Sequence, residues 1–485
     1  MRWLDERLDL RAAKSALLDR EVPARLTWWH TLGSATLTAF AVQLVTGIVL
    51  ATYYAPSPDH AYESVRYIDH EVMSGSLLRG MHHWGASAMV ILILAHLIRV
   101  FSVGAYKYPR EINWLVGVGL LFIVLAFSFT GYLLPWDQKA YWATAVGTNI
   151  AGTTPLVGAK VATLLRGGPE LGAATLTRFY AFHVLWFPAL LGILVLVHLV
   201  ILIRQGIAPR PHALEEGAPP RTNDSRYPGY YRTAYAGTKR AGVRFWPDVV
   251  GKDAIVSLAV VAVIVLLALA LRAPLESPAD PTDTAYIPRP EWYFLPLYQL
   301  LKLVPGSLES LVAIGVPSAL VVALIALPFF DRRSTRNLLH RPIGLAALVF
   351  VLGGSGLLIG AAVRSAGPPV PPEVGRPLTS MERAGRALFQ SQQCVGCHKI
   401  LGRGGEQGPD LTEMGLHHSP GWLHSFIELP TRFHPDSRMP AYGPPVLSHE
   451  EIDELARYVS TLRGKAGPEA QPQYADTFPE SPPPK

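Results

Sequence analysis

Long apolar segments without charged side chains alternate with polar segments through most of the chain. Seven of them are long enough to cross a bilayer and contain no Lys, Arg, Asp or Glu, at approximately 32–54, 80–98, 112–134, 179–203, 254–271, 311–330 and 343–363. A helix of about 20 apolar residues spans the hydrocarbon core of a membrane, which is roughly 30 Å thick. The pattern therefore predicts seven transmembrane helices.

The polar segments between these spans carry Lys and Arg unevenly. The N-terminus and the loops after spans two, four and six hold about 22 of these residues, whereas the other three loops hold about nine. Because positive loops stay inside, we expect a cytoplasmic N-terminus and an outer location for everything beyond residue 364. Residues 1–25 are too charged for a cleavable signal peptide, so the first span is expected to act as an uncleaved insertion signal.

Composition divides the remainder of the chain. Residues 2–20 are predicted to form a short amphipathic helix on the cytoplasmic surface, and the basic loop 205–250 is predicted to be irregular. The predicted parts are an N-terminal segment (1–31), a four-helix core (32–204), a cytoplasmic loop (205–253), a three-helix part (254–363), a Pro-rich linker (364–378), a small soluble module (379–463) and a disordered tail (464–485). The fold class is all-α, a polytopic membrane helical bundle plus a small all-α module.

The charge balance supports this class. Only 16% of the residues are charged, below the roughly 25% usual for soluble domains. The net charge of +6 is spread between apolar runs instead of forming one patch. Membrane lipid is therefore the expected partner, and nucleic acid is not.

Four histidines lie inside two of the spans as matched pairs. His82 and His96 are 14 residues apart, and His183 and His198 are 15 residues apart. At about 1.5 Å and 100° per residue, either spacing returns to nearly the same helix face about 21–22 Å further along. Two such helices face to face would offer two bis-imidazole sites, an arrangement that suits two stacked b-type haems. A satisfied interhelical contact is the alternative for a single polar residue, but coincidence at both pairs is not expected.

Depth in the membrane sets the pairing of these histidines. His82 is expected to pair with His183 near the outer face, and His96 with His198 near the cytoplasmic face. Glycines recur at the same interval in spans one and three, where a missing side chain would admit a haem edge: Gly33, Gly47, Gly117 and Gly131. Ordinary small-residue helix packing is the alternative for these glycines.

Two arginines stand three residues from the ligands of span two. Arg79 precedes His82, and Arg99 follows His96. Each could neutralise haem propionates. The alternative for Arg99 is a charge that only fixes topology at the membrane edge.

The C-terminal module contains Cys394-Val-Gly-Cys397-His398, and its two cysteines are the only ones in the chain. This C-x-x-C-H pattern is typical of covalent c-type haem attachment, with the histidine as one axial ligand. A disulfide, or half of a zinc site, is the alternative. Met439 is the expected sixth ligand, with Met414 as second choice. Ser448 and Glu451 form a capping box that predicts a final helix at 449–462.

Pro290-Glu291-Trp292-Tyr293 lies between spans five and six on the predicted outer side. A half-buried carboxylate in a rigid aromatic loop can accept a proton from a quinol hydroxyl. The plainer interpretation is an interfacial aromatic anchor beside an unrelated acid.

These motifs together resemble cytochrome b of the quinol–cytochrome c oxidoreductases, and within them the plastoquinol–plastocyanin branch. The resemblance covers about residues 20–362. It is carried by Arg79 through His96, by Gly131-Tyr-Leu-Leu-Pro-Trp-Asp-Gln138, by Leu176-Thr-Arg-Phe-Tyr180, by the Pro-Glu-Trp-Tyr loop and by the 15-residue spacing, which is 14 in the mitochondrial type. The module from 379 is similar to a class I cytochrome c, and Gly408-Pro409 fits that family's haem-proximal turn.

The sequence departs from that branch in several places. The branch usually splits the protein after four spans, whereas here both parts and a cytochrome c form one chain. Thr31 stands where the branch has a haem-tethering Cys, and Ile203 stands where it has an associated Arg, so an extra tethered haem is in doubt. His83 replaces the usual Arg.

The resemblance implies a subunit of a proton-translocating quinol–cytochrome c reductase in a bacterial inner membrane. Its cofactors would be two non-covalent b-type haems, one covalent c-type haem and quinol or quinone, with quinol bound near Glu291, Tyr293 and Tyr132 on the outer face. The implied partners are a Rieske iron–sulfur protein, a cytochrome c or terminal oxidase as electron acceptor, and a second copy of the complex. Because both cysteines belong to the haem c motif, an iron–sulfur cluster must come from another subunit.

Two other interpretations remain at this stage. A dihaem, quinol-oxidising membrane anchor of another dehydrogenase or reductase would explain the histidine pairs, although such anchors commonly need only four or five spans. A transporter or receptor with a c-type sensor module would explain the C-terminal part. The number of haems of each type separates the three.

Overall fold

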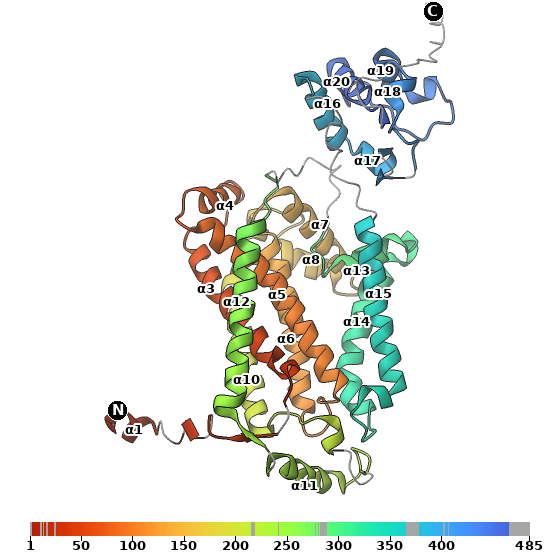
Figure 1. The fold of residues 1–485 in the computed structure, drawn as a ribbon. Helices are drawn as coiled ribbons and strands as arrows, with labels where there is room; N and C mark the ends of the chain where they lie inside the picture. The colour runs from red at the N-terminus through yellow and green to blue at the C-terminus, as the bar shows by residue number, and fades with distance from the viewer. Residues whose placement is uncertain are drawn as a thin grey trace, which may run out of the picture. The chain divides into compact units, whose positions relative to one another are not determined.

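The computed structural model describes the 485-residue chain except residues 1, 10–11, 13, 16–17, 24–25, 215–218, 241, 277, 280, 282–288, 365–377, 401–402, 406 and 465–485. The described part is mostly helical, as predicted (Figure 1). Its helices are α1 (Arg2–Leu8), α3 (Leu32–Ala51), α4 (Ala61–His70), α5 (Gly75–Ser102), α6 (Glu111–Tyr132), α7 (Gln138–Gly152), α8 (Gly158–Arg166), α9 (Ala173–Ala181), α10 (Phe187–Gln205), α11 (Tyr227–Arg240), α12 (Val250–Leu271), α13 (Leu295–Lys302), α14 (Gly306–Phe330), α15 (Pro342–Arg364), α16 (Ser380–Ser391), α17 (Cys394–Cys397), α18 (Met414–His417), α19 (Pro420–Glu428) and α20 (His449–Val459).

Short elements complete the fold. Two antiparallel pairs of two-residue strands join β1 (Glu21–Val22) to β2 (Val243–Arg244) and β3 (Lys399–Ile400) to β4 (Arg403–Gly404). The 3₁₀ segments are η1 (Trp28–Thr31), η3 (Pro211–Leu214), η5 (Leu338–His340) and η6 (Pro430–Arg432), and the π-helical segments are η2 (Phe182–Trp186) and η4 (Phe245–Val249).

Seven helical stretches in the described residues are long and apolar enough to cross a membrane: Trp28–Ala51, Gly75–Ser102, Glu111–Tyr132, Ala173–Gln205, Phe245–Leu271, Leu308–Phe330 and Pro342–Arg364. Each overlaps one predicted span, and the first and third end two or three residues earlier than predicted, at Ala51 and Tyr132, so the predicted number and order are confirmed. In a membrane every backbone amide must find its partner inside the protein, and a continuous helix achieves this.

The first five spans form two packed helix pairs and a flanking helix. α3 packs along α5, α12 covers both, and α6 packs along α10 (Figure 1). Polar contacts join α3 to α12, where the Ser34 hydroxyl donates to Asp253 over 2.7 Å and Thr38 and Ser257 share a hydrogen bond of 2.7 Å. The two histidine-bearing helices, α5 and η2–α10, therefore each have a glycine-bearing helix as neighbour.

The fourth span is not a uniform α-helix. Between α9 and α10 the π segment Phe182–Trp186 contains His183, and the Phe187 amide donates to the Phe182 carbonyl five residues back. A π turn holds roughly one residue more than an α turn. Pro188, in the first turn of α10, lacks the amide that a regular α-helix would use there. The extra residue explains why the second histidine spacing is 15 and the first is 14.

The loops contain more helix than the sequence patterns predict. α4, α7 and α8 lie in the connections after the first and third spans, and α11 lies in the loop predicted to be irregular. That prediction is wrong for residues 227–240. Tyr227 and Tyr231 are buried one helical turn apart, so an apolar face made of tyrosines supports α11 although the segment also contains Pro and Gly.

The N-terminal segment also differs from its prediction. α1 ends at Leu8, and Asp9 adopts φ 47°. The predicted helix over residues 2–20 is therefore interrupted at Asp9, with residues 12, 14 and 15 helical again, and residues 10–11, 13 and 16–17 lie outside the described part. The linker 364–378 and the tail 464–485 fall almost wholly outside the described residues as well.

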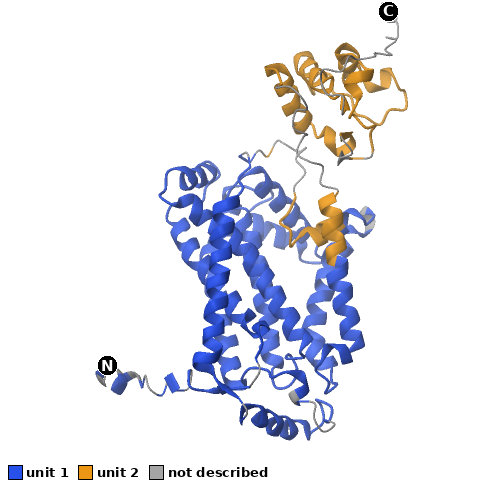
Figure 2. Ribbon diagram, viewed as in Figure 1, with its two compact units in different colours: residues 1–279, 300–354 blue, residues 280–299, 355–485 orange. Residues whose placement is uncertain are grey.

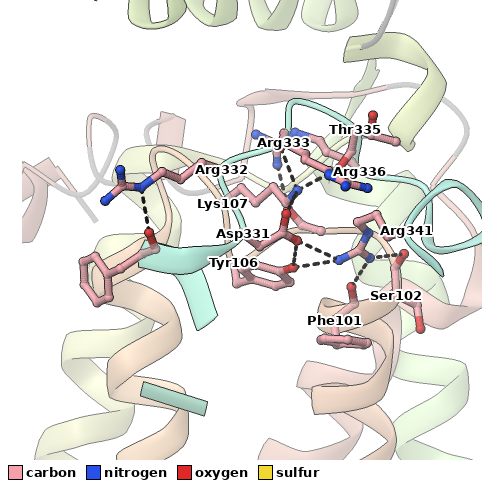
Figure 3. A network of polar contacts seen from close by, with 12 residues as sticks. Phe101, Ser102, Tyr106, Lys107, Asp331, Arg332, Arg333, Thr335, Arg336 and Arg341 are labelled. Carbon is pink, nitrogen blue, oxygen red and sulfur yellow. Dashed lines mark hydrogen bonds and ion pairs between the residues drawn. The ribbon is translucent and has the colours of Figure 1, made fainter. Parts of the chain in front are cut away.

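A network of polar contacts joins the loop between α5 and α6 to the loop between α14 and α15 (Figure 3). The Lys107 amine donates to Asp331 over 3.0 Å and to the carbonyls of Arg333 and Thr335 over 2.8 Å each. Arg341 donates to the Tyr106 hydroxyl over 2.7 Å, and that hydroxyl donates to Asp331. These contacts tie the four-helix core to the three-helix part.

Burial changes the acid–base behaviour of this network. Burial lowers the pKa of the Lys107 amine to about 8, against the opposing effect of Asp331. For Asp331, burial alone would raise the pKa of the carboxyl. The hydrogen bond from Tyr106 and the charge of Lys107 outweigh it and hold that pKa below its usual value. The ion pair is therefore formed at neutral pH.

Two compact units divide the chain (Figure 2): residues 1–279 with 300–354, and residues 280–299 with 355–485. The second unit contains the C-terminal module, whose core is made by side chains from α16, α19, α20 and the loops between them, including Phe389, Leu423, Ile427, Ile452 and Leu455. α20 begins at the predicted capping box, where the Ser448 hydroxyl accepts from the Glu451 amide. It ends at Val459, three residues before the predicted end.

Candidate haem-binding site

The histidine pair predicted for the outer face, called the outer pair below, brings two imidazole rings close together from different spans. The ring centroids of His82 on α5 and His183 in the π segment are 6.1 Å apart, with an angle of 75° between the planes. A metal–imidazole bond is about 2 Å long, so two rings that share one metal ion keep their centroids roughly 6 Å apart. The separation fits a bis-histidine site.

The neighbours of His82 fix which of its nitrogens can bind a metal. The Thr46 hydroxyl on α3 donates to the Val42 carbonyl over 2.7 Å, so only its lone pairs are left for Nδ1 of His82, 2.9 Å away. Nδ1 is therefore the protonated nitrogen and Nε2 carries the free lone pair. The Gln43 amide also donates to the His82 carbonyl over 2.9 Å, and Gly85 leaves the space that Gln43 occupies.

His183 is oriented in the same way from α6. Its Nδ1 lies 3.0 Å from the Phe127 carbonyl and 3.5 Å from the Thr130 hydroxyl. Because a carbonyl can only accept, Nδ1 donates and Nε2 again has the free lone pair. When the nitrogen that does not bind the metal donates such a hydrogen bond, the imidazole is held in orientation and its metal-binding nitrogen becomes more basic.

The inner pair, His96 on α5 and His198 on α10, is held less tightly. The two rings lie within electrostatic range of each other. Nδ1 of His198 is buried, and the Asn113 backbone faces it without meeting hydrogen-bond geometry in the described part of the chain. The described residues therefore orient the outer imidazoles more firmly than the inner ones.

Each of the four predicted glycines faces one of the four histidines. A Cβ built on Gly33 would lie 3.4 Å from His96, on Gly47 3.1 Å from His82, on Gly117 3.6 Å from His198 and on Gly131 2.3 Å from His183. Values below 3.0 Å require a shift, so Gly131 is the position where a side chain would displace its histidine. The four glycines therefore make room for the histidine rings, whose donor set fits haem iron, and the haem edge expected beside these glycines stays a prediction.

Arg99 and Arg79 differ in what they contact. Nε and Nη2 of Arg99 are buried without a hydrogen-bond partner among the described residues, which suits an anionic group of a bound molecule at the inner level. Arg79 instead donates to Asp69 over 2.7 Å and to the Ala273 carbonyl over 2.6 Å. The structure therefore gives Arg79 partners within the protein, and its contact with a haem propionate stays a prediction.

The C-terminal module presents the c-type motif on the short helix α17. Cys394 and Cys397 are not joined to each other, and burial raises the pKa of the Cys394 thiol to about 12. His398 is buried, and its Nδ1 lies 2.8 Å from the Pro409 carbonyl. That contact makes Nδ1 the donor and leaves Nε2 for a metal. A Cβ on Gly408 would lie 2.6 Å from the His398 ring, so the predicted Gly408-Pro409 turn holds this histidine.

Both candidate sixth ligands pack on the core of this module. Met439 and Met414 are each half-buried against the cluster that also contacts Cys394 and Val395. The Met439 amide donates to the Ser437 hydroxyl over 3.3 Å, whereas Met414 begins α18. Because both methionines pack against the same cluster, the assignment of Met439 as the sixth haem ligand stays a prediction.

The residues predicted to contact quinol belong to different units. Tyr132 ends α6 in the first unit, with the Lys139 amine 5.4 Å from its ring centroid. Glu291 and Tyr293 belong to the second unit and form a turn before α13, in which the Phe294 amide donates to the Glu291 carbonyl over 2.9 Å. Glu291 is half-buried and the Tyr293 ring lies 5.4 Å from Trp292 and 4.8 Å from Phe294.

The two threonines beside the outer histidines, Thr46 and Thr130, were not predicted from the sequence. Thr46 and Thr130 each precede one of the predicted glycines, Gly47 and Gly131. This repeated Thr-Gly pair at the outer level was a usable signal. It was overlooked because a Thr inside a span normally bonds back to its own helix.

Three family models match successive parts of the chain. The model described as "Cytochrome b/b6/petB" matches residues 17–206, the model of the C-terminal part of cytochrome b, "b/b6/petD", matches 278–369, and the cytochrome c model matches 382–463. The predicted fusion of both cytochrome b parts with a cytochrome c is thereby confirmed.

Individual proteins agree with these matches. The menaquinol:cytochrome c reductase cytochrome b subunit of Bacillus subtilis (strain 168) is 46% identical over 214 residues, which is 42% of this chain and 96% of the relative. Cytochrome b6 of Mastigocladus laminosus is 41% identical over 206 residues, 42% of this chain and 96% of the relative. A solved structure named "Hyperthermophilic respiratory Complex III" has a TM-score of 0.63 and 28% identity, covering 80% of this chain and 94% of that chain.

Proposed function

Because this chain belongs to the cytochrome b/b6 family, we propose that it is the cytochrome b subunit, fused to its own cytochrome c, of a proton-translocating quinol:cytochrome c reductase. The observation that carries the proposal is the outer pair, in which His82 and His183 face each other with Nε2 free on both rings. The C-x-x-C-H motif in the same chain adds the third haem.

The cofactors follow from the donor sets. His82 with His183, and His96 with His198, would hold two b-type haems, and Cys394, Cys397 and His398 would hold one c-type haem with Met439 as its sixth ligand. When bound, these haems supply one-electron carriers between the two faces of the membrane and toward the acceptor. Gly33, Gly47, Gly117 and Gly131 leave the room they need, and Arg99 balances a propionate.

Quinol oxidation is assigned to the outer face. A quinol gives up two protons and two electrons, one electron to a Rieske iron–sulfur partner and the other across the membrane toward quinone at the cytoplasmic face. Glu291 accepts a proton from the quinol hydroxyl, and the aromatic rings of Trp292 and Tyr293, which pack on each other, follow it in the same turn.

The partners and the topology complete the proposal. The Rieske protein must be a separate subunit, since the chain's two cysteines both belong to the haem c motif. A cytochrome c or terminal oxidase would take electrons from the C-terminal module on the outer face, and the complex would be a dimer. The N-terminus would be cytoplasmic, as the Lys and Arg distribution predicts.

The substitution Glu291→Gln tests the proposed quinol chemistry. It keeps the size of the side chain but cannot accept the proton, so quinol-dependent cytochrome c reduction by the purified complex should fall by about 10²-fold. Glu309→Gln, at an exposed position in the first turn of α14, is the matched control and should leave turnover unchanged.

The same substitution distinguishes the proposed function from the alternative, a dihaem membrane anchor. A dihaem anchor that hands quinol electrons to another enzyme would not use Glu291. Unchanged turnover in Glu291→Gln, with haem content as in the wild type, would favour that anchor and overturn the proposed role of the loop.

A further inference from the structure

Two imidazoles and a carboxylate come together in the C-terminal module, and none of them is a predicted haem ligand. His424 and Glu428 lie four residues apart on α19, and His449 is the first residue of α20. One ligand atom of each residue lies within 4.8 Å of those of the other two. We propose that this His424–Glu428–His449 cluster binds a divalent transition metal ion of the zinc type, which ties α19 to α20.

The ligands project from rigid elements. Residues four apart on a helix share one face, so His424 and Glu428 point the same way from α19. The Ser419 hydroxyl caps the start of that helix, accepting from the Trp422 amide, and Ser448 caps the start of α20. α19 and α20 pack on each other through Leu423, Ile427, Ile452 and Leu455 (Figure 1). The three proposed ligands therefore stand on packed helices and not in a loop.

The distances are close to those of a metal site. Nδ1 of His449 lies 3.6 Å from a Glu428 carboxylate oxygen, and ligand atoms around a tetrahedral zinc ion with bonds of about 2.0–2.1 Å are roughly 3.3 Å apart. The two imidazole rings are nearly parallel, 11° between planes with centroids 5.9 Å apart. Small side-chain rotations close the site, and they are allowed because His424 and Glu428 are only partly buried and His449 is exposed.

A second carboxylate supports the arrangement. Nδ1 of His424 faces Asp453 over 3.9 Å, which leaves Nε2 of His424 for the metal. Metal-bound histidines commonly direct their other nitrogen to a carboxylate. Asp453 is itself held by Arg457 at 3.1 Å. A Cβ built on Gly443 would lie 3.1 Å from Cγ of Glu428. The glycine therefore leaves room for the Glu428 side chain.

The donor set selects the kind of metal. Two imidazoles and one carboxylate suit zinc and related transition metals, whereas magnesium prefers carboxylates and water. Three protein ligands leave a fourth position for water. Because such an ion binds only the folded module, it should raise the stability of that module by mass action.

The test uses the full-length, haem-loaded protein in detergent. Wild type, the His424→Gln/His449→Gln double variant and a His417→Gln control at an exposed position are equilibrated with ZnCl₂ and washed, and zinc per haem c is measured. Wild type and His417→Gln should each retain one zinc more than the double variant. The zinc X-ray absorption spectrum of the wild type should show imidazole scattering with bonds of about 2.0 Å.

A stability measurement completes the test. ZnCl₂, but not MgCl₂, should raise the thermal midpoint for loss of haem c absorbance in wild type and His417→Gln and leave it unchanged in the double variant. Equal zinc content in all three proteins, with haem c absorbance intact, would overturn the proposal. A zinc-induced rise of the midpoint in the double variant would overturn it too.

Discussion

At the scale of single residues, orientation of the histidines matters as much as their presence. The spacing of histidines and glycines was readable from the sequence, because both follow helix periodicity. The Thr46–His82 contact could not be predicted, because it depends on how far α3 and α5 are shifted along each other. Side-chain packing sets that shift. The same limit applies to Arg79, whose partners Asp69 and Ala273 come from distant segments.

Removal of the Thr46 hydroxyl should weaken the outer b-type site. Thr46→Val leaves Nδ1–H of His82 buried without its acceptor, and loss of such a contact typically lowers metal affinity by about 10–100-fold. Thr130→Val is the matched variant on α6 and should have a smaller effect, because the Phe127 carbonyl still accepts from His183. Titration of the haem-depleted protein with haem, followed by absorbance, measures both affinities. Equal losses in the two variants would contradict this difference.

At the scale of elements, the seven spans were predictable because each is a long run without charges, and their ends are charged. The π segment could not be predicted from the sequence. With regular α geometry, 14 residues fall about 40° short of full turns and 15 residues run about 60° past them, so the two pairs cannot both be in register on straight helices. Only the structure shows that η2 absorbs the extra residue.

Deletion of Val184 from the π segment should therefore keep both b-type haems. The deletion restores regular α geometry and leaves His183 and His198 14 residues apart, as on α5. Insertion of one Ala after Leu191 turns His198 by about 100° relative to His183 and should remove one haem. The b:c haem ratio of the purified variants gives the result. Loss of a b haem on deletion, or its retention on insertion, would show that the π segment does not set the register.

The network between the two interhelical loops makes a second prediction at this scale. Lys107→Met removes the donor shared by Asp331 and two carbonyls, and breaking a buried ion pair costs about 3 kcal/mol. The thermal midpoint for loss of b-haem absorbance should fall accordingly. Arg332→Gln is the control, since Arg332 is exposed and its side chain donates to the nearby Phe329 carbonyl instead of to Asp331. A midpoint of Lys107→Met equal to that of the control would contradict a stabilising role for the network.

At the scale of the whole molecule, one chain combines parts that match three family models. The order of the parts and the all-α fold class could be predicted, because composition changes sharply at each boundary. The helices of the connecting segments could not be predicted, as α11 shows most clearly, because its buried tyrosines stand among Pro and Gly residues that are typical of loops. The central claim concerns the combination: two b-type sites and one c-type site in a single polypeptide.

Haem stoichiometry of the purified polypeptide tests that claim most directly. A dithionite-reduced minus oxidised spectrum, with haems b and c quantified as pyridine haemochromes, should give two b haems and one c haem per chain, with haem c alone remaining on the denatured polypeptide in a gel. His82→Ala should reduce the b content, because it removes one imidazole of the outer pair. A wild-type chain that carries haem c but no b-type absorbance would contradict the account.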